Sequence, residues 1–391
     1  MNYNRTIRSC FVGYVVQAIV NNFIPLLFIT LQRQYDIPLS EITLLITVNF
    51  GVQLTVDMLS AFFVDRIGYR ASITAAHFFS AAGLILLPIL PEIMDPYAGL
   101  LTAVCLYAVG GGLIEVLISP IMESCPTDNK EKAMSLLHSF YCWGQVGVVL
   151  FSTLFFKAFG LDNWRILSFL WAVIPIANAV MFLKVPIAPL VPDNEKGMPF
   201  RELLKSKLFW ILMLMMICSG ASELAVSQWA SFFAEKGLSI SKAAGDLAGP
   251  MTFAILMGSA RAFYGKFGHR IALDRFMTAS AALCVISYLM ISLVPNAAVN
   301  LIGCGICGLS VGIMWPGTFS KAAASLKRGG TALFSLLALA GDVGCSAGPT
   351  LVGFVSGSDS NMKTGILAAA AFPVGIMICS LGFLFTRKTK A

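Results

Sequence analysis

The chain has 391 residues, of which 57% are hydrophobic and only 12% are charged, and its formal net charge is +7. A soluble domain has about 45–50% apolar and about 25% charged residues, so this composition excludes a soluble globular protein. The apolar residues form runs of roughly 20 residues without alternation, which predicts membrane-spanning helices and excludes a β-barrel.

Charged, proline-rich or glycine-rich clusters separate the apolar runs and predict about twelve transmembrane helices. In chain order the predicted spans are 10–32, 42–64, 71–90, 97–121, 133–157, 164–184, 208–234, 243–264, 271–293, 298–320, 331–355 and 364–386. The first run is too long for the apolar part of a cleavable signal peptide and carries Asn21 and Asn22 at its middle. We therefore interpret it as a retained first span.

Basic residues are distributed unevenly between the two sides of the predicted membrane. If the N-terminus is cytoplasmic, 21 of the 27 Lys and Arg residues, Arg261 among them, fall on the cytoplasmic side. The six on the outer side are Arg33, Lys157, Arg165, Lys236, Lys242 and Lys363. This asymmetry predicts that both termini are cytoplasmic, with a bacterial inner membrane as the expected location. It also explains the net charge without a nucleic-acid partner.

The longest connection, residues 185–207, is predicted to be a cytoplasmic linker between two six-helix bundles, 1–184 and 208–391. Its first part contains four prolines, which favour an irregular chain, and Phe200–Lys207 is predicted to be a short amphipathic helix at the membrane interface.

The two halves repeat each other at a nearly constant offset of about 200 residues. The matching pairs are 65–70 with 265–270, Gly112 and Pro120 with Gly308 and Pro316, and Gly144 and Gly147 with Gly341 and Gly344. Both halves begin on the same side of the membrane, so the repeat is parallel. It predicts a central cavity between two bundles and transport by alternating access.

Residues 61–70, Ala-Phe-Phe-Val-Asp-Arg-Ile-Gly-Tyr-Arg, resemble the signature loop G-x-L-x-D-R-x-G-R-R of the major facilitator superfamily. The resemblance implies the major facilitator fold over the whole chain, a monomeric state, and a loop that latches the cytoplasmic side. Residues expected to belong to this gate, including those of the second copy, are Asp57, Asp65, Arg66, Gly68, Arg70, Gly268 and Arg270.

Within that superfamily the chain looks most like the fucose–proton symporter group. Val20–Phe23 resembles that group's N-N-x-N-D, Gly112–Pro120 resembles G-x-x-E-T-x-x-N-P, and Leu136–Gly144 resembles its fifth span. The aspartate of the first motif falls on Pro25, and the asparagine of the second is Ser119. Glu115 is the acidic residue that carries over, which implies proton-coupled uptake of a sugar or similar small polar solute.

Acidic residues inside membrane spans are rare and costly, and they usually serve function. We single out Glu115, Glu223 and Asp342 as candidates for proton coupling and for contact with the solute. Desolvation disfavours the charged form of a carboxylate, so such a residue is expected to bind and release a proton. For each of them, a purely structural interhelical hydrogen bond is the alternative.

Amides and aromatic side chains at similar depth are the further candidates for binding the solute. Three of these candidates share one span: Glu223, Gln228 and Trp229. The acid and the amide could hydrogen-bond to hydroxyl groups of a solute, and the indole could stack on the face of a sugar ring. Alternatively, Trp229 is an aromatic residue at the membrane interface. Gln145 is the repeat partner of Asp342. The remaining candidates are Gln17, Asn21, Asn22, Asn49, Gln53 and His138.

The sequence contains no Walker A motif and no cluster with metal-ligand spacing, so we expect neither a nucleotide-driven pump nor a cofactor or metal. Nothing resembles a nucleophile–base pair, so an enzyme is not expected. The leading prediction is a proton-coupled symporter whose partners are a small solute, protons and the lipid bilayer. A proton-coupled drug or metabolite exporter is the main alternative, followed by a nutrient sensor and a lipid flippase.

Overall fold

A computed structural model describes residues 3–126, 130–187, 200–267, 271–326, 330–357 and 361–388. Every regular element within these ranges is a helix. They form two compact units, each described on its own. The first contains α1 to α8 together with the segment Ser241–Leu247, and the second contains α9 to α11 and α13 to α19.

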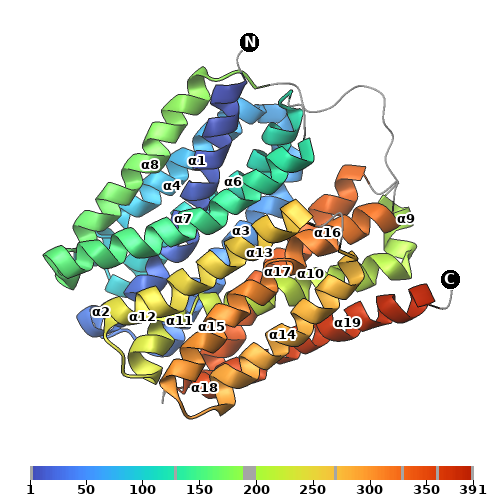
Figure 1. The fold of residues 1–391 in the computed structure, drawn as a ribbon. Helices are drawn as coiled ribbons and strands as arrows, with labels where there is room; N and C mark the ends of the chain where they lie inside the picture. Colours follow the sequence, from blue (N-terminus) through green and yellow to red (C-terminus); the bar gives the residue numbers. More distant parts are fainter. Residues whose placement is uncertain are drawn as a thin grey trace. The chain divides into compact units, whose positions relative to one another are not determined.

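The helices of the first unit correspond to the first six predicted spans (Figure 1). They are α1 (Asn4–Asn22), η1 (Ile24–Leu27), α2 (Phe28–Tyr35), α3 (Leu39–Ile67), α4 (Tyr69–Leu86), α5 (Leu90–Ile93), α6 (Pro96–Ser124), α7 (Lys130–Phe159), η2 (Leu161–Asn163) and α8 (Trp164–Lys184).

The remaining helices correspond to the last six predicted spans. They are α9 (Phe200–Lys205), α10 (Lys207–Ser227), α11 (Ala230–Phe232), η3 (Phe233–Gly237), α12 (Lys242–Asp246), η4 (Leu247–Met251), α13 (Thr252–Phe267), α14 (Leu273–Leu293), α15 (Ala297–Val311), α16 (Met314–Ser325), α17 (Gly330–Ser356), α18 (Met362–Ala369) and α19 (Ala371–Lys388). In the described part of the chain, ten helical segments are long and apolar enough to cross a membrane.

Several predicted spans are interrupted and not continuous α-helices. In the first span, α1 ends at Asn22 and a 3₁₀ turn that contains Pro25 leads to α2. Proline has no N–H to donate, so the regular ladder cannot continue through it. The seventh span breaks at Gln228–Trp229, and the tenth at Gly312–Ile313, shortly before Pro316. Each break frees backbone groups that need other partners.

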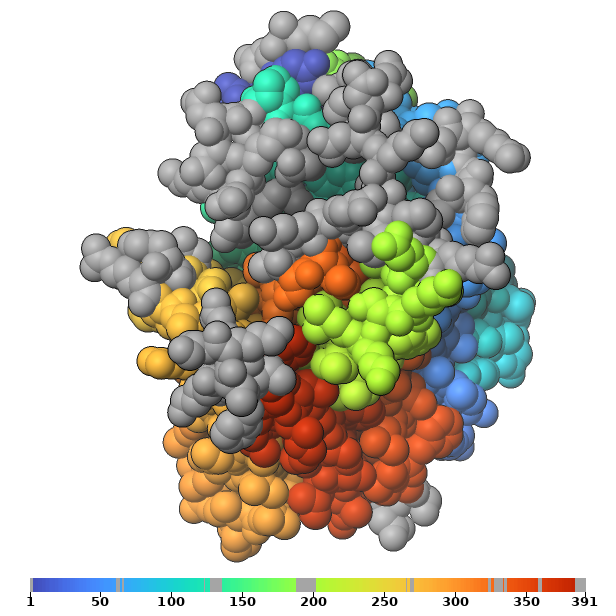
Figure 2. Space-filling view, turned by 90° about the vertical axis from the view of Figure 1, so that its right-hand side faces the viewer, coloured from blue at the N-terminus to red at the C-terminus, as the bar shows by residue number. Residues whose placement is uncertain are grey.

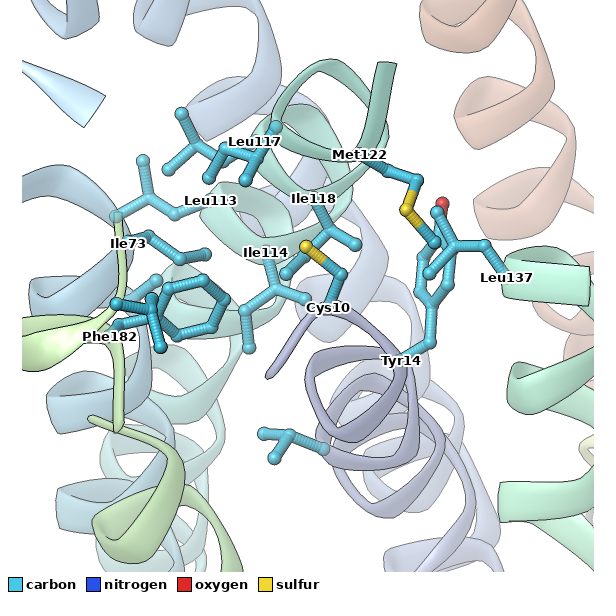
Figure 3. Packing of buried hydrophobic residues seen from close by; sticks show 14 of the residues in the cluster. Cys10, Tyr14, Ile73, Leu113, Ile114, Leu117, Ile118, Met122, Leu137 and Phe182 are labelled. Carbon is cyan, nitrogen blue, oxygen red and sulfur yellow. The ribbon is translucent and has the colours of Figure 1, made fainter. Parts of the chain in front are cut away.

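An apolar core in the first unit holds α1, α4, α6 and α8 together (Figure 3). Cys10 and Tyr14 of α1 lie against α6, where Ile114 and Ile118 are fully buried, and Phe182 of α8 joins the same cluster. Burial of a side chain such as Ile or Phe contributes about 1.5–3 kcal/mol. This packing fixes the position of α1 against α6, which the polar site described below requires.

In the second unit, α10 and α17 approach each other closely. A Cβ atom added at Gly344 would lie 2.0 Å from the carbonyl oxygen of Ile217, so only glycine fits there. Small residues at such contacts are typical of helix packing in membranes. The short helix predicted in the second part of the linker is present as α9, and Figure 2 shows it in light green at the surface of this unit with the start of α10.

The turn between α3 and α4 depends on Gly68, which has φ +92° and ψ +145°. Non-glycine residues in such a region cost about 1–3 kcal/mol. We therefore expect Gly68→Ala to lower the thermal unfolding midpoint of the purified protein. Gly51→Ala, inside α3 with open space around its Cβ position, is the matched control and is expected to leave the midpoint unchanged or to raise it. Equal effects of the two substitutions would contradict this account.

Candidate functional site

A chain of hydrogen-bonded polar side chains crosses the interior of the first unit. Gln17 of α1 donates through Nε2 to Oε1 of Gln53 on α3 at 3.0 Å and to Oε2 of Glu115 on α6 at 3.1 Å. Gln53 in turn donates to Oδ1 of Asn21 at 2.9 Å and to Oδ1 of Asn49 at 3.1 Å. Five of the candidate residues thus form one amide–carboxylate cluster.

The amide–carboxylate cluster is buried at its centre and more open at Glu115. Gln17 and Gln53 are each 2% exposed, whereas Glu115 is half-buried. The carbonyl oxygen of the Gln17 side chain is buried and has no hydrogen-bond partner among the described residues. Gly111 allows this packing, because a Cβ atom there would lie 3.1 Å from the Gln53 carboxamide. An unpaired buried acceptor costs about 1–3 kcal/mol, so Gln17 offers a place for a donor.

Other predicted residues of the first unit lie beside this cluster. Asn22 donates to the carbonyl of Ala18 at 2.9 Å and to the hydroxyl of Tyr141 at 3.4 Å. The His138 ring lies 5.3 Å from that of Tyr14, whose hydroxyl shares a 2.8 Å hydrogen bond with Ser119 one turn beyond Glu115. Gln145 is buried on α7. The two tyrosines were not anticipated from the sequence.

In the second unit Glu223 forms an ion pair with Arg261. The Nη2 atom of Arg261 lies 3.2 Å from Oε2 of Glu223, and both side chains are about nine-tenths buried, at 12% and 10% exposure. Arg261 also donates through Nε to the carbonyl of Gly312, at the break between α15 and α16, at 3.3 Å. Arg261 was expected among the charges of the cytoplasmic surface, but its side chain lies inside the second unit, where it is 12% exposed.

The predicted aromatic and acidic residues of the seventh and eleventh spans are also buried. Trp229 is fully buried, donates its indole N–H to the carbonyl of Pro349 at 2.9 Å, and packs edge-on against Phe232. Gln228 is 2% exposed and Asp342, on α17, is 4% exposed. Trp229 therefore braces the break between α10 and α11 in this conformation.

A second buried ion pair, Lys242 with Asp246, was not singled out from the sequence. The two groups lie 3.2 Å apart, and Asp246 is 1% exposed. Lys242 also donates to the carbonyl of Leu26 in η1 at 2.5 Å, and Thr153 of α7 donates to Asp246 at 3.4 Å. The sequence could have predicted this pair, because Asp246 lies inside the predicted span 243–264 and four residues after Lys242, which is the spacing of neighbours on one helix face.

The predicted gate residues are only partly described. Gly68 ends α3, and Arg70 donates through Nη1 to the carbonyls of Phe182 and Leu183 at the end of α8, at 2.8 and 2.9 Å. Asp57 is half-buried on α3. The side chains of Asp65 and Arg66, and all of Gly268 and Arg270, lie outside the described residues.

Among the residues described, no group of three or more His, Cys, Asp or Glu side chains is placed to hold a metal ion.

The sequence model of the Major Facilitator Superfamily matches residues 10–349. The chain belongs to this superfamily. It is therefore a multi-pass membrane transporter, and the prediction of an all-α protein with the major facilitator fold is confirmed. Small-molecule solutes and a surrounding bilayer follow from this membership.

Solved structures of other superfamily members share the fold. The Escherichia coli fucose:proton symporter FucP is 18% identical with a TM-score of 0.69, covering 97% of this chain and 98% of that one. A bacterial homologue of the human lysosomal transporter Spinster is 14% identical with a TM-score of 0.79, covering 98% of both chains. The D-xylose–proton symporter is 12% identical with a TM-score of 0.77, covering 95% and 97%. No curated protein matches the sequence.

The Glu223–Arg261 pair allows a stability test. Removal of one partner of a buried ion pair costs about 3–5 kcal/mol, whereas replacement of both by apolar residues is often close to neutral. We expect Arg261→Met to lower the thermal unfolding midpoint markedly and the double substitution Arg261→Met with Glu223→Leu to recover the part of the loss that comes from the unpaired carboxylate, while the Gly312 carbonyl still lacks its donor.

The control is Arg165→Met, which breaks the more exposed pair with Glu92 and is expected to change stability by at most about 1 kcal/mol. A double variant as unstable as Arg261→Met alone would show that the pair matters for packing and not for charge balance.

Proposed function

We propose that this transporter carries a sugar or a similar small polar solute together with protons, by alternating access. The observation that carries the proposal is the buried amide–carboxylate cluster of Asn21, Asn49, Gln53, Gln17 and Glu115. Binding sites for polar ligands place a few convergent polar groups in an otherwise apolar wall. Carboxamides both donate and accept, which matches the hydroxyl groups of a polyol.

The coupling proton is assigned first to Glu115. This carboxylate is half-buried, so it is within reach of a proton, and it accepts a hydrogen bond from Gln17. Protonation converts a carboxylate from an acceptor into a donor. The side-chain amide of Gln17 that donates to Glu115 also carries an unpaired oxygen, Oε1. Rotation of this amide would turn Oε1 toward Glu115, where it could accept a hydrogen bond from the protonated carboxyl group. Proton binding would thereby change which atoms the amide–carboxylate cluster offers to a solute.

Glu223 and Asp342 are the other two candidates for proton coupling. Glu223 is held in an ion pair with Arg261, which suits a group that holds the second unit together. Asp342 is buried in α17 at the repeat position of Gln145. We propose Asn22, His138, Gln145, Gln228 and Trp229 as further solute contacts in other states of the transport cycle.

The names of two structural relatives, FucP and the D-xylose–proton symporter, support a sugar as the solute class. The bias of basic residues toward one side supports cytoplasmic termini in a bacterial inner membrane. The proposal further takes 1–184 and 208–391 as the moving bundles, joined by the linker 185–207, in a monomer. The gate residues Asp57, Asp65, Arg66, Gly68, Arg70, Gly268 and Arg270 are proposed to close the cytoplasmic side.

The test uses proteoliposomes that contain an internal pH dye, with a panel of monosaccharides and polyols added outside. Symport predicts internal acidification on addition of the correct solute, because the proton enters with it. Glu115→Gln is expected to abolish acidification and uphill accumulation while solute exchange at equal concentrations continues. Glu92→Gln, an exposed acid paired with Arg165, is the matched control and should behave as the unchanged protein.

Two outcomes would redirect the proposal. Uphill uptake at the normal rate in Glu115→Gln would remove Glu115 from coupling, and the same assay on Glu223→Gln and Asp342→Asn would then locate the proton site. Absence of acidification with every sugar would withdraw the sugar proposal and favour a proton-coupled exporter of drugs or metabolites.

A further inference from the structure

The surface of the first unit contains an apolar groove beside the proposed gate residues Gly68 and Arg70, which are among the residues that line it. It lies between α4 and α8 near the end of α3 and has a volume of about 650 Å³. Ile67, Phe78 and Leu183, which line it, are 59%, 65% and 56% exposed. Ala71 and Ala75 leave room between them. A membrane protein meets acyl chains on such a surface, so the groove has the shape and polarity for one.

One of the residues that line this groove is a cation held in a fixed position. Arg70 lines it and is held in place because its Nη1 atom donates to the carbonyls of Phe182 and Leu183. The Phe182 side chain points into the apolar core near Ile73 and Ile114 (Figure 3), so the carbonyls that hold Arg70 belong to an anchored helix end. The guanidinium is therefore positioned before any ligand arrives.

The remaining donors of Arg70 suit a phosphate. Its two recorded hydrogen bonds both use Nη1, which leaves Nε and Nη2 on the other edge of the planar fork. A guanidinium edge of this kind binds phosphate oxygens in pairs. Lys184, the last residue of α8, is exposed beside Leu183. Among the described side chains neither Arg70 nor Lys184 is ion-paired with a carboxylate.

We propose that this groove binds one anionic phospholipid, with an acyl chain along α4 and the phosphate on Arg70. The charge of Arg70, with exposed Lys184 next in the chain to the lining residue Leu183, favours a lipid of net negative charge over a zwitterionic one, whose own cation would lie near Arg70. The site contains no residue proposed to bind the solute or the coupling proton, and it shares Gly68 and Arg70 with the proposed gate. In the orientation proposed above, it faces the cytoplasmic leaflet, where anionic lipids attract basic residues.

The test is native mass spectrometry of the full-length protein in detergent with equal amounts of phosphatidylglycerol and phosphatidylcholine. The unchanged protein is expected to retain phosphatidylglycerol preferentially. Arg70→Gln removes charge-assisted hydrogen bonds and should lower its affinity for phosphatidylglycerol about tenfold. Arg165→Gln, an equal charge change near the other end of α8, is the control and should retain the lipid normally.

Arg70→Gln also removes the hydrogen bonds to the last carbonyls of α8 and could unfold the protein for that reason. A second variant therefore tests the groove without changing Arg70. Ala75→Trp fills the groove while the bonds of Arg70 stay intact, and it should reduce retention of both lipids. Retention of phosphatidylglycerol by Ala75→Trp at the level of the unchanged protein would overturn the site. Equal loss in Arg70→Gln and Arg165→Gln would overturn it too, because it would show a general charge effect. Lipid retention is measured without transport, so failure of the symport proposal leaves this result unaffected.

Discussion

The structure depends on one constraint: inside a bilayer the backbone has no water to bond, so every carbonyl freed by a helix break needs a partner from the protein. The chain meets this need with long donor side chains. Lys242 donates to Leu26 where the first span breaks, and Arg261 donates to Gly312 where the tenth span breaks. Arg70 does the same at the end of α8. Lys and Arg side chains in this protein therefore hydrogen-bond to backbone carbonyls as well as forming ion pairs with carboxylates.

This constraint separates the acidic residues into two kinds. Asp246 and Glu223 lie beside cations that are also bound to backbone carbonyls, so a change in either charge would disturb a helix break. Glu115 is bonded to the side-chain amide of Gln17, and a side-chain amide can rotate without breaking a helix. A proton bound at Glu115 would therefore cost less in structure than one bound at Asp246 or Glu223, which supports the proposed coupling role of Glu115.

The positions of the spans could be predicted from the sequence because they depend on local composition. Apolar runs and their charged boundaries predicted twelve spans, and helices lie within each of these ranges in the described part of the chain. The signature loop predicted the superfamily. The sequence also indicates which side chains are buried, because amides such as those of Asn21, Asn49 and Gln53 are costly to expose to lipid. Their shared bonds were not predictable, since periodicity gives a helix face but not which neighbouring helix meets it.

Long-range pairing is the part that a single sequence leaves open, and Arg261 shows the reason. A basic residue near the end of a predicted span is compatible with the cytoplasmic surface, and only the packing of α10 against its neighbours brings Glu223 to it, 38 residues earlier in the chain. Asp246 is different, because its partner Lys242 lies one turn away and the pair was visible in the sequence. An acid within a predicted span should therefore first be tested for a basic residue at i±4; one without such a neighbour needs the tertiary structure before a proton is assigned to it.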